Sequence, residues 1–369
     1  MSLSLVLLLT GCSLPQVSAE SRLFLNLSAS LIADHPLAQP NFNGTTAGGF
    51  SAIAYSAQKN RIYTLANDAT NPRLYTLNFR PINAPSSPTD LAIEAIADLK
   101  DPTEADSPPS TAPSTKEGLV LTRRGTAFVA SEGNPSLNIP PRLSEFQITD
   151  GTWQQDLPLP KQYWPLQPDG TSGLGLASGR GLKSLAINEE GDRLFAATAA
   201  PLQQDASQPY SRFLHYWIGE PEPILISEHL YPLDSAPTGP SEGLIDLVSI
   251  DGAGHFLSLE RSHSKTAGDR TVLYQLATGV ATDTSGIRTL PPDLKGIVPI
   301  LKKPLLDLAE LDIPLQNLEG LTLGPRLPDG SRSLLLVGNN STHPEVPTQV
   351  LTLKLERRSS QVESRSPSS

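Results

Sequence analysis

The chain has 369 residues, of which 18% are charged and 35 are proline, and its formal net charge is −10. The negative charge argues against a nucleic-acid partner, because nucleic-acid phosphates would be repelled. Proline disfavours helix interiors and central strands, so this composition indicates a turn-rich, all-β protein. The length suits one large repeat domain or two ordinary domains.

The N-terminal residues indicate export. A short apolar run at 5–9 leads into Leu-Thr-Gly-Cys at 9–12, which resembles the bacterial lipobox. We therefore expect a signal peptide at 1–11, a linker at 12–20 and lipidation of Cys12, which would anchor the protein in the bacterial cell envelope, on its periplasmic or outer face. The alternative is an ordinary secretory signal that is cleaved after residues 17–19. Cys12 is the single cysteine, so no intrachain disulfide is possible.

Residues 21–356 contain five units with one pattern: a strand, a tight turn, a second strand that ends in polar residues, and a third strand. The turns carry the glycine and aspartate that tight hairpins require, and the strands are rich in β-branched and aromatic residues. The first two strands of the units are expected at 51–55 and 61–65, 118–121 and 127–130, 184–187 and 194–197, 246–250 and 256–259, and 321–323 and 334–337. The third strands are expected at 72–77, 141–146, 212–216, 271–274 and 348–353.

Repeated four-stranded sheets around an axis predict a β-propeller of five or six blades. An outer strand is expected at 223–226, and an N-terminal strand at 23–27 would complete the last blade. A sixth blade would be degenerate or assembled from 22–31 and 287–290. The alternative architecture is a pair of β-sandwiches.

Two segments differ in composition from the repeats. Residues 81–116 are rich in proline, serine, threonine and acidic residues, with one candidate strand at 91–96, and we expect 101–114 to form a disordered surface loop. Residues 357–369 form a polar tail with nothing to bury.

The triplet Glu-Gly-Leu occurs three times, at 117–119, 242–244 and 319–321, each time at the start of an apolar run. Because inner strands line the axis of a propeller, side chains at the strand ends of several blades would converge there. The candidates are Asp68, Glu117, Glu132, Asp246, Glu260 and Glu319, together with Asn67, Asn339 and Asn340.

Convergent carboxylate and amide oxygens are the ligands that Ca²⁺ prefers, and such an ion could polarise a phosphate and activate water. The predicted metal ligands are Asp68, Glu117, Glu132, Asp246, Glu319 and Asn340. The alternative is a structural network in which the carboxylates pair with Arg142, Arg261 and Lys183.

Several motifs together resemble the phytase-like family of bacterial secreted proteins, described as having "esterase-like activity of phytase". They are 48–55 followed by 65–68, 117–119 followed by 131–133 and 141–142, 259–262, and 317–325. The resemblance extends over about 50–356. It implies a propeller fold and metal-assisted hydrolysis of phosphate or other esters.

The family pattern has glutamates where Lys183 and Ala199 stand here, and an aspartate where Asn339 stands. These replacements favour one cation or none, and Lys183 could contact an anionic substrate directly. The predicted catalytic residues are Glu117, Glu132, Glu260, Arg261 and Glu319, and the predicted substrate-binding residues are Arg142 and Lys183.

We therefore expect a monomeric envelope lipoprotein that hydrolyses a small-molecule ester or phosphate. The alternative is a non-catalytic propeller that binds a ligand or another envelope protein, and the depleted carboxylates favour it.

Overall fold

The computed structural model describes residues 23–37, 41–42, 44–66, 68–79, 91–100, 115–134, 137, 139–165, 174–234, 243–264, 268–340 and 346–358. The expected signal peptide, linker and lipidation site Cys12 lie outside these residues, as do Asn67, Glu242, most of 81–116 and most of the tail. Within the described ranges, no helix is long and apolar enough to cross a membrane.

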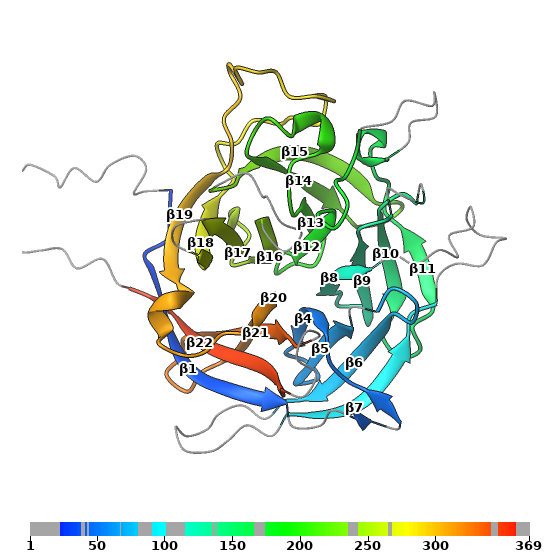
Figure 1. Ribbon diagram of the computed structural model, residues 1–369, viewed down its shortest axis with the longest axis vertical. Coiled ribbons are helices and arrows are strands. Elements are labelled where there is room, and N and C mark those ends of the chain that lie inside the picture. Colours follow the sequence, from blue (N-terminus) through cyan, green and yellow to red (C-terminus); the bar gives the residue numbers. More distant parts are fainter. Residues whose placement is uncertain are drawn as a thin grey trace, which may run out of the picture.

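The described residues form five antiparallel sheets of four strands, arranged around an axis as a five-bladed β-propeller (Figure 1). The predicted fold class is confirmed, and of the five or six blades predicted the described residues form five. The first blade consists of β4 (Phe50–Ser56), β5 (Arg61–Ala66), β6 (Arg73–Asn78) and β7 (Ala92–Asp98). The second consists of β8 (Lys116–Leu121), β9 (Thr126–Ser131), β10 (Arg142–Gln147) and β11 (Trp153–Asp156). The third consists of β12 (Leu182–Ile187), β13 (Arg193–Thr198), β14 (Tyr210–Trp217) and β15 (Ile224–Pro232).

The fourth and fifth blades follow the same order from the axis outward. The fourth blade consists of β16 (Gly243–Ser249), β17 (His255–Ser264), β18 (Gly268–Ala277) and β19 (Leu301–Asp307). The fifth consists of β20 (Asn317–Arg326), β21 (Arg332–Asn339), β22 (Thr348–Arg357) and β1 (Leu27–Leu37). The remaining elements are the small hairpin β2 (Asn41–Phe42) and β3 (Thr45–Thr46) and three 3₁₀ turns, η3 (Lys161–Tyr163), η4 (Gln203–Asp205) and η5 (Leu308–Leu311).

The N-terminal strand closes the ring, as expected, but it is not the predicted segment 23–27. β1 begins at Leu27 and pairs with β22, so the two ends of the propeller lie side by side (Figure 1). Pro36 is tolerated in β1 because this strand forms the outer edge of its sheet, where proline's missing N–H leaves no ladder bond unmade. Segment 287–290, the other expected part of a sixth blade, lies in the connection between β18 and β19.

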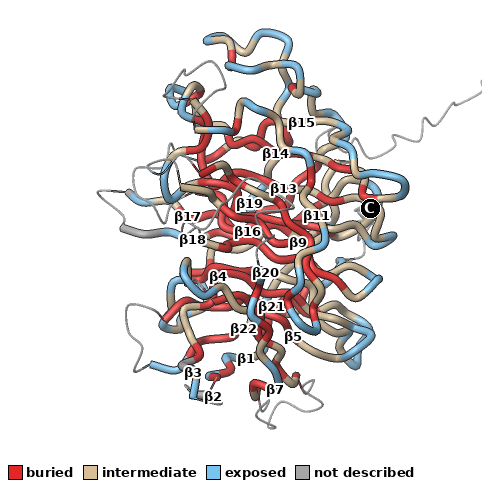
Figure 2. Tube along the Cα trace, turned by 90° about the vertical axis from the view of Figure 1, so that its right-hand side faces the viewer, coloured by how far each residue is buried: buried red, intermediate tan, exposed pale blue. Residues whose placement is uncertain are grey.

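Burial decreases from the axis outward, and exposed residues concentrate in the connecting loops (Figure 2). The inner strands β4, β8, β12, β16 and β20 are largely buried, because each packs against the inner strands of two neighbouring blades. The second strands are buried between blades, and outer strands such as β7 alternate between buried and exposed residues. The five inner strands therefore surround the axis of the ring, which has an end at each face.

A register shift recurs where each inner strand begins. In all five blades one residue of the inner strand is skipped in the pairing with the second strand. Such a bulge redirects one side chain. The skipped residues are Ser51, Glu117, Lys183, Ile245 and Glu319, and we call them the axial ring.

The glycine after the axial-ring glutamate allows neighbouring blades to approach closely. A Cβ at Gly118 would lie 2.4 Å from the backbone oxygen of Lys183 in the next blade, and a Cβ at Gly320 would lie 2.8 Å from the backbone nitrogen of Ile53. The glycine of the Glu-Gly-Leu triplet is thus required for packing around the axis.

We expect Gly118→Ala to lower the free energy of unfolding by about 1–3 kcal/mol, because the added methyl group meets backbone that cannot move independently. Gly286→Ala is the matched control, since nothing lies within 4 Å of a Cβ there. Urea unfolding followed by circular dichroism measures both. Equal midpoints for the two variants would contradict this role for Gly118.

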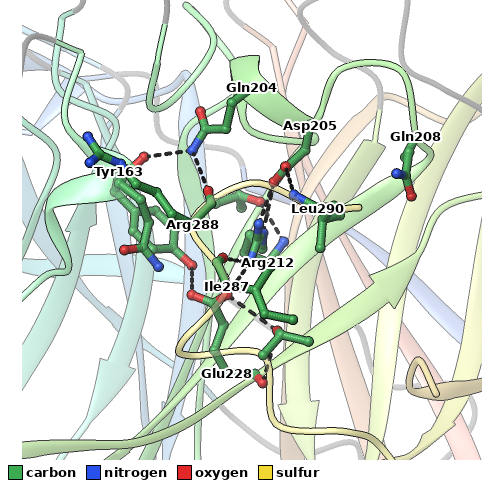
Figure 3. A network of polar contacts seen from close by, with 12 residues as sticks. Tyr163, Gln204, Asp205, Gln208, Arg212, Glu228, Ile287, Arg288 and Leu290 are labelled. Carbon is green, nitrogen blue, oxygen red and sulfur yellow. Dashed lines mark hydrogen bonds and ion pairs between the residues drawn. The ribbon is translucent and has the colours of Figure 1, made fainter. Parts of the chain in front are cut away.

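A buried charge network fastens the connection between β18 and β19 to the third blade (Figure 3). The Arg212 side chain is 0% exposed and donates to Asp205 Oδ2, at 3.0 Å from Nε and 2.6 Å from Nη2, and to Glu228. It also donates to the Ile287 carbonyl at 3.0 Å, and Asp205 accepts from the Leu290 N–H at 2.8 Å. This network holds the long connection against the end of blade three.

Candidate functional site

The axial ring brings charges from different blades together where the inner strands begin, and we call this end of the axis the upper mouth. Lys183 Nζ lies 2.6 Å from Glu319 Oε2 and 3.6 Å from Glu117 Oε2. Lys183 belongs to the third blade and Glu319 to the fifth, and these blades are not adjacent in the ring. Their side chains can therefore meet only across the axis.

Arg261 and Asn317 fix the second oxygen of Glu319. Arg261 Nη1 lies 3.4 Å from Glu319 Oε1, and Arg261 Nη2 donates to the Leu318 carbonyl at 2.5 Å. The Asn317 amide also donates to Glu319 Oε1. Glu319 is thus held between two cations, and it in turn positions Lys183.

Glu117 has a perturbed acidity. Burial raises its pKa to about 7, although the Lys183 charge opposes the rise, and the charges of Glu132 and Glu319 add to it. Burial lowers the pKa of Lys183, but the charges of Glu319 and Glu117 outweigh this effect and raise it above the ordinary value. A carboxyl group with a raised pKa therefore lies beside an ammonium group with a raised pKa.

Glu132 lies next to Glu117 at the end of β9. Its Oε2 accepts a hydrogen bond from the Thr115 hydroxyl at 3.1 Å, and its Oε1 accepts from the Gly181 N–H at 3.2 Å. Of the predicted catalytic residues, Glu117, Glu132, Arg261 and Glu319 gather at the upper mouth.

Glu260, also predicted to be catalytic, is turned away from this group. It precedes Arg261 on β17, and successive side chains of a strand point to opposite faces. Glu260 Oε2 lies 2.7 Å from both the Tyr231 hydroxyl and Lys302 Nζ, and its Oε1 accepts from the Asp234 N–H at 2.7 Å. The structure therefore places Glu260 between blades three and four, where it stabilises their packing.

Three of the predicted metal ligands are already engaged elsewhere. Asp246 accepts backbone N–H bonds from Leu247 and Leu321, both at 2.8 Å, and so links blades four and five. Asp68 accepts from Thr70 and Asn71 within its own turn. The side-chain oxygen of Asn340 accepts from the Gly49 N–H at 2.9 Å.

The predicted substrate-binding residues are separated in the structure. Arg142 forms an ion pair with Asp156 at 2.5 Å inside the second blade, between β10 and the outer strand β11. Lys183 is part of the axial ring. Asn339, the last candidate, is buried at the end of β21.

The Glu-Gly-Leu triplet at 242–244 is not equivalent to those at 117–119 and 319–321. By strand register, Ile245 takes the place in the fourth blade that Glu117 and Glu319 take in theirs, three residues after Glu242. Sequence reasoning also missed Ser51, whose hydroxyl donates to the Lys116 carbonyl at 2.7 Å. Aligning the five hairpin turns, rather than the triplets, would have identified both positions.

The donor groups at the upper mouth do not fit a divalent cation as they stand. Ca²⁺ takes six to eight oxygen ligands, whereas the space between Glu117 and Glu319 is taken by the Lys183 ammonium group, and Arg261 adds a second positive charge. Among the described residues, no three His, Cys, Asp or Glu side chains are grouped as a metal site requires. The calcium site remains a prediction from the sequence.

These features define a five-bladed propeller with a buried, charged cluster at the upper mouth. Residues 45–340 match the family model described as "Phytase-like: Esterase-like activity of phytase", and the chain belongs to this family.

Solved propeller structures show low similarity to this chain. The catalytic domain of an α-L-arabinofuranosidase from Coprinopsis cinerea is 9% identical with a TM-score of 0.42, over 90% of this chain and 97% of that one. An endo-arabinase from Bacteroides thetaiotaomicron is 12% identical with a TM-score of 0.42, over 88% and 98% of the two chains. No curated protein matches the chain. None of these values is high enough to transfer an activity.

Proposed function

We propose that the upper mouth hydrolyses a small ester or phosphoester that carries negative charge, with Glu117 as the general base. The observation that carries this proposal is the pKa of Glu117, raised by burial to about 7, beside the Lys183 ammonium group. A general base is most effective when its pKa lies near the working pH. Perturbed carboxyl groups next to a specific charge partner are typical of catalytic sites.

Each charged side chain has a role in this reaction. Glu117 takes a proton from a water molecule, whose oxygen attacks the ester carbon or phosphorus, and the released alkoxide is protonated by solvent. Lys183 has three N–H donors, and the ion pair with Glu319 at 2.6 Å uses one of them, whereas Glu117 Oε2 at 3.6 Å lies beyond hydrogen-bond distance. A remaining donor can hold an anionic oxygen of the substrate. Glu319 and Arg261 position Lys183, and the charge of Glu132 keeps Glu117 basic.

The second candidate is a binding propeller without catalysis, as the depleted carboxylates already suggested. One observation favours it: Glu117, Lys183, Arg261 and Glu319 are all buried and largely neutralise one another. Such a network can serve as the structural base of a ligand pocket. The two candidates differ in whether any ester is turned over.

The proposal is tested with a panel of phosphomonoesters and carboxylesters, with and without a chelator. We expect turnover that survives the chelator, because Lys183 supplies the positive charge beside Glu117. We also expect kcat/KM to rise with pH through about 7, as Glu117 loses its proton and becomes a base.

Two results would contradict the proposal in different ways. Turnover that is lost with the chelator and restored by calcium would favour the metal site predicted from the sequence. Absence of turnover across the panel, with saturable binding of one of its members, would favour the binding propeller.

Anchoring in the bacterial envelope through Cys12 is part of the proposed function and rests on the sequence alone. The lipobox-like residues 9–12 support it. Expression with radiolabelled palmitate tests it, since label in the wild type that is absent from Cys12→Ser is the expected result.

A further inference from the structure

A hollow lies at the opposite end of the axis from the upper mouth, and we call it the lower mouth. It has a volume of about 460 Å³ and is lined by the hairpins that follow all five inner strands. The upper mouth lies where these strands begin. Leu121, which lines the hollow, lies four residue steps after Glu117, and this corresponds to about 13 Å along β8. The two mouths are therefore distinct sites.

Apolar side chains make up much of the wall of the hollow. A large apolar or aromatic residue that is half-buried stands near the end of each inner strand. These residues face the same cavity from five blades: Tyr55, Leu121, Ile187, Val248, Ile250 and Leu323. Such a concave apolar surface can hold the body of a small ligand.

The rim of the hollow is positively charged. Arg123, Arg326 and Arg332 line it, whereas Glu189 is its only carboxylate among the described lining residues. Arg326 donates to the Gly330 carbonyl at 3.3 Å, and Arg332 lies 3.9 Å from Glu189, whose side chain is 68% exposed. The guanidinium group of Arg123 donates to the Glu189 carbonyl. The rim thus has an excess of positive charge on a chain whose net charge is −10.

We propose that the lower mouth binds a small amphiphilic anion: its apolar body fills the hollow and its carboxylate, sulfonate or phosphate contacts Arg326 and Arg332. Arginine suits this role because its planar group presents paired N–H donors to a carboxylate or phosphate. The five-bladed closure gives the site its shape, since the wall requires one strand end from each blade. The site is independent of hydrolysis at the upper mouth.

Fluorescence titration with 8-anilinonaphthalene-1-sulfonate, an aromatic anion, tests the proposal on the full chain. We expect saturable binding at a single site, and a dissociation constant that rises about tenfold in Arg326→Ala and again in the double variant with Arg332→Ala. Glu189→Gln should bind more tightly, because it removes the rim's negative charge. Arg270→Ala, at an exposed arginine that pairs with Asp307 on the outer part of blade four, is the matched control and should be unchanged.

The neutral analogue N-phenyl-1-naphthylamine separates charge from apolar binding. Equal affinity for the neutral and anionic probes would overturn the proposal, as would unchanged binding in the Arg326→Ala and Arg332→Ala double variant. An equal loss in Arg270→Ala would show a general charge effect and overturn it as well. Because Arg326 is exposed and Arg332 half-buried, circular dichroism should show intact folds in every variant.

Discussion

Replacing Glu117 with glutamine is expected to lower kcat by about 10²–10⁴-fold, because glutamine cannot accept a proton from the attacking water. Glutamine has nearly the same shape and remains beside Lys183, which keeps its shorter ion pair with Glu319 at 2.6 Å. Hydrolysis of the best ester in the panel, measured at pH 8, gives the result. The control is Glu310→Gln, at an exposed residue of η5, which should retain full activity.

The same variant is expected to be more stable than the wild type at pH 8. The pKa of Glu117 is raised from 4.5 to about 7, so the folded protein binds this proton more tightly than the unfolded chain does. That stabilisation is fully present below pH 4.5 and is lost as the pH rises through about 7. The pKa difference between the folded and unfolded states corresponds to about 3 kcal/mol of stability. Glutamine at position 117 retains this stability at pH 8 because it mimics the protonated acid.

Thermal unfolding at pH 5 and pH 8 measures this effect. Glu117→Gln and the wild type should unfold at more similar temperatures at pH 5, and the variant should be the more stable at pH 8. A variant that loses activity without this pH-dependent gain would show that Glu117 is not held in a desolvating site. A variant that gains stability but keeps full activity would remove Glu117 from the catalytic role.

Arg212→Met is expected to lower the free energy of unfolding by about 3–5 kcal/mol. The side chain is fully buried between Asp205 and Glu228, and its removal leaves two buried carboxyl groups without their cation. Burial already raises the pKa of Glu228, and loss of Arg212 would raise it further. Urea unfolding measures the loss. Arg61→Met, which breaks an exposed pair with Glu94, should lose at most about 1 kcal/mol.

A double variant locates the cause of this destabilisation. Adding Glu228→Gln to Arg212→Met should recover part of the lost stability, because glutamine can still accept the Tyr163 hydroxyl without a buried charge. Limited proteolysis should cleave the single variant first within 283–290, the segment that the network fastens (Figure 3). Equal stability of the single and double variants would show that lost packing, rather than unpaired charge, causes the effect.

Much of the fold follows from local patterns. Strands such as β5, β9 and β13 were predictable because apolar and β-branched residues lie between turns that carry glycine or aspartate. The closing role of the N-terminal strand was predicted, but its bounds were not. Residues 23–27 and 27–37 both suit an edge strand, and only pairing with β22 selects the second.

The candidate site was only partly predictable, because contacts between segments far apart in the chain decide where its side chains lie. Glu117 and Glu319 were found because each begins a Glu-Gly-Leu triplet. Glu242 begins the same triplet, but the strand register places Ile245 at the equivalent position of the fourth blade. Glu260 has the same charge and a similar strand-end position, yet it faces Lys302 between two blades. Its orientation follows from the alternation of β17 and from a partner 42 residues away in the chain.

The sequence alone determined that the chain alternates short strands and tight turns, because turn chemistry and side-chain periodicity act over a few residues. It also determined which carboxyl groups stand at strand ends. Only the tertiary structure decided that a bulge takes one residue of each inner strand out of the pairing, and that Lys183 stands between Glu117 and Glu319. The acidity of Glu117 depends on burial and on charges from other blades, and such effects exist only once the ring has closed.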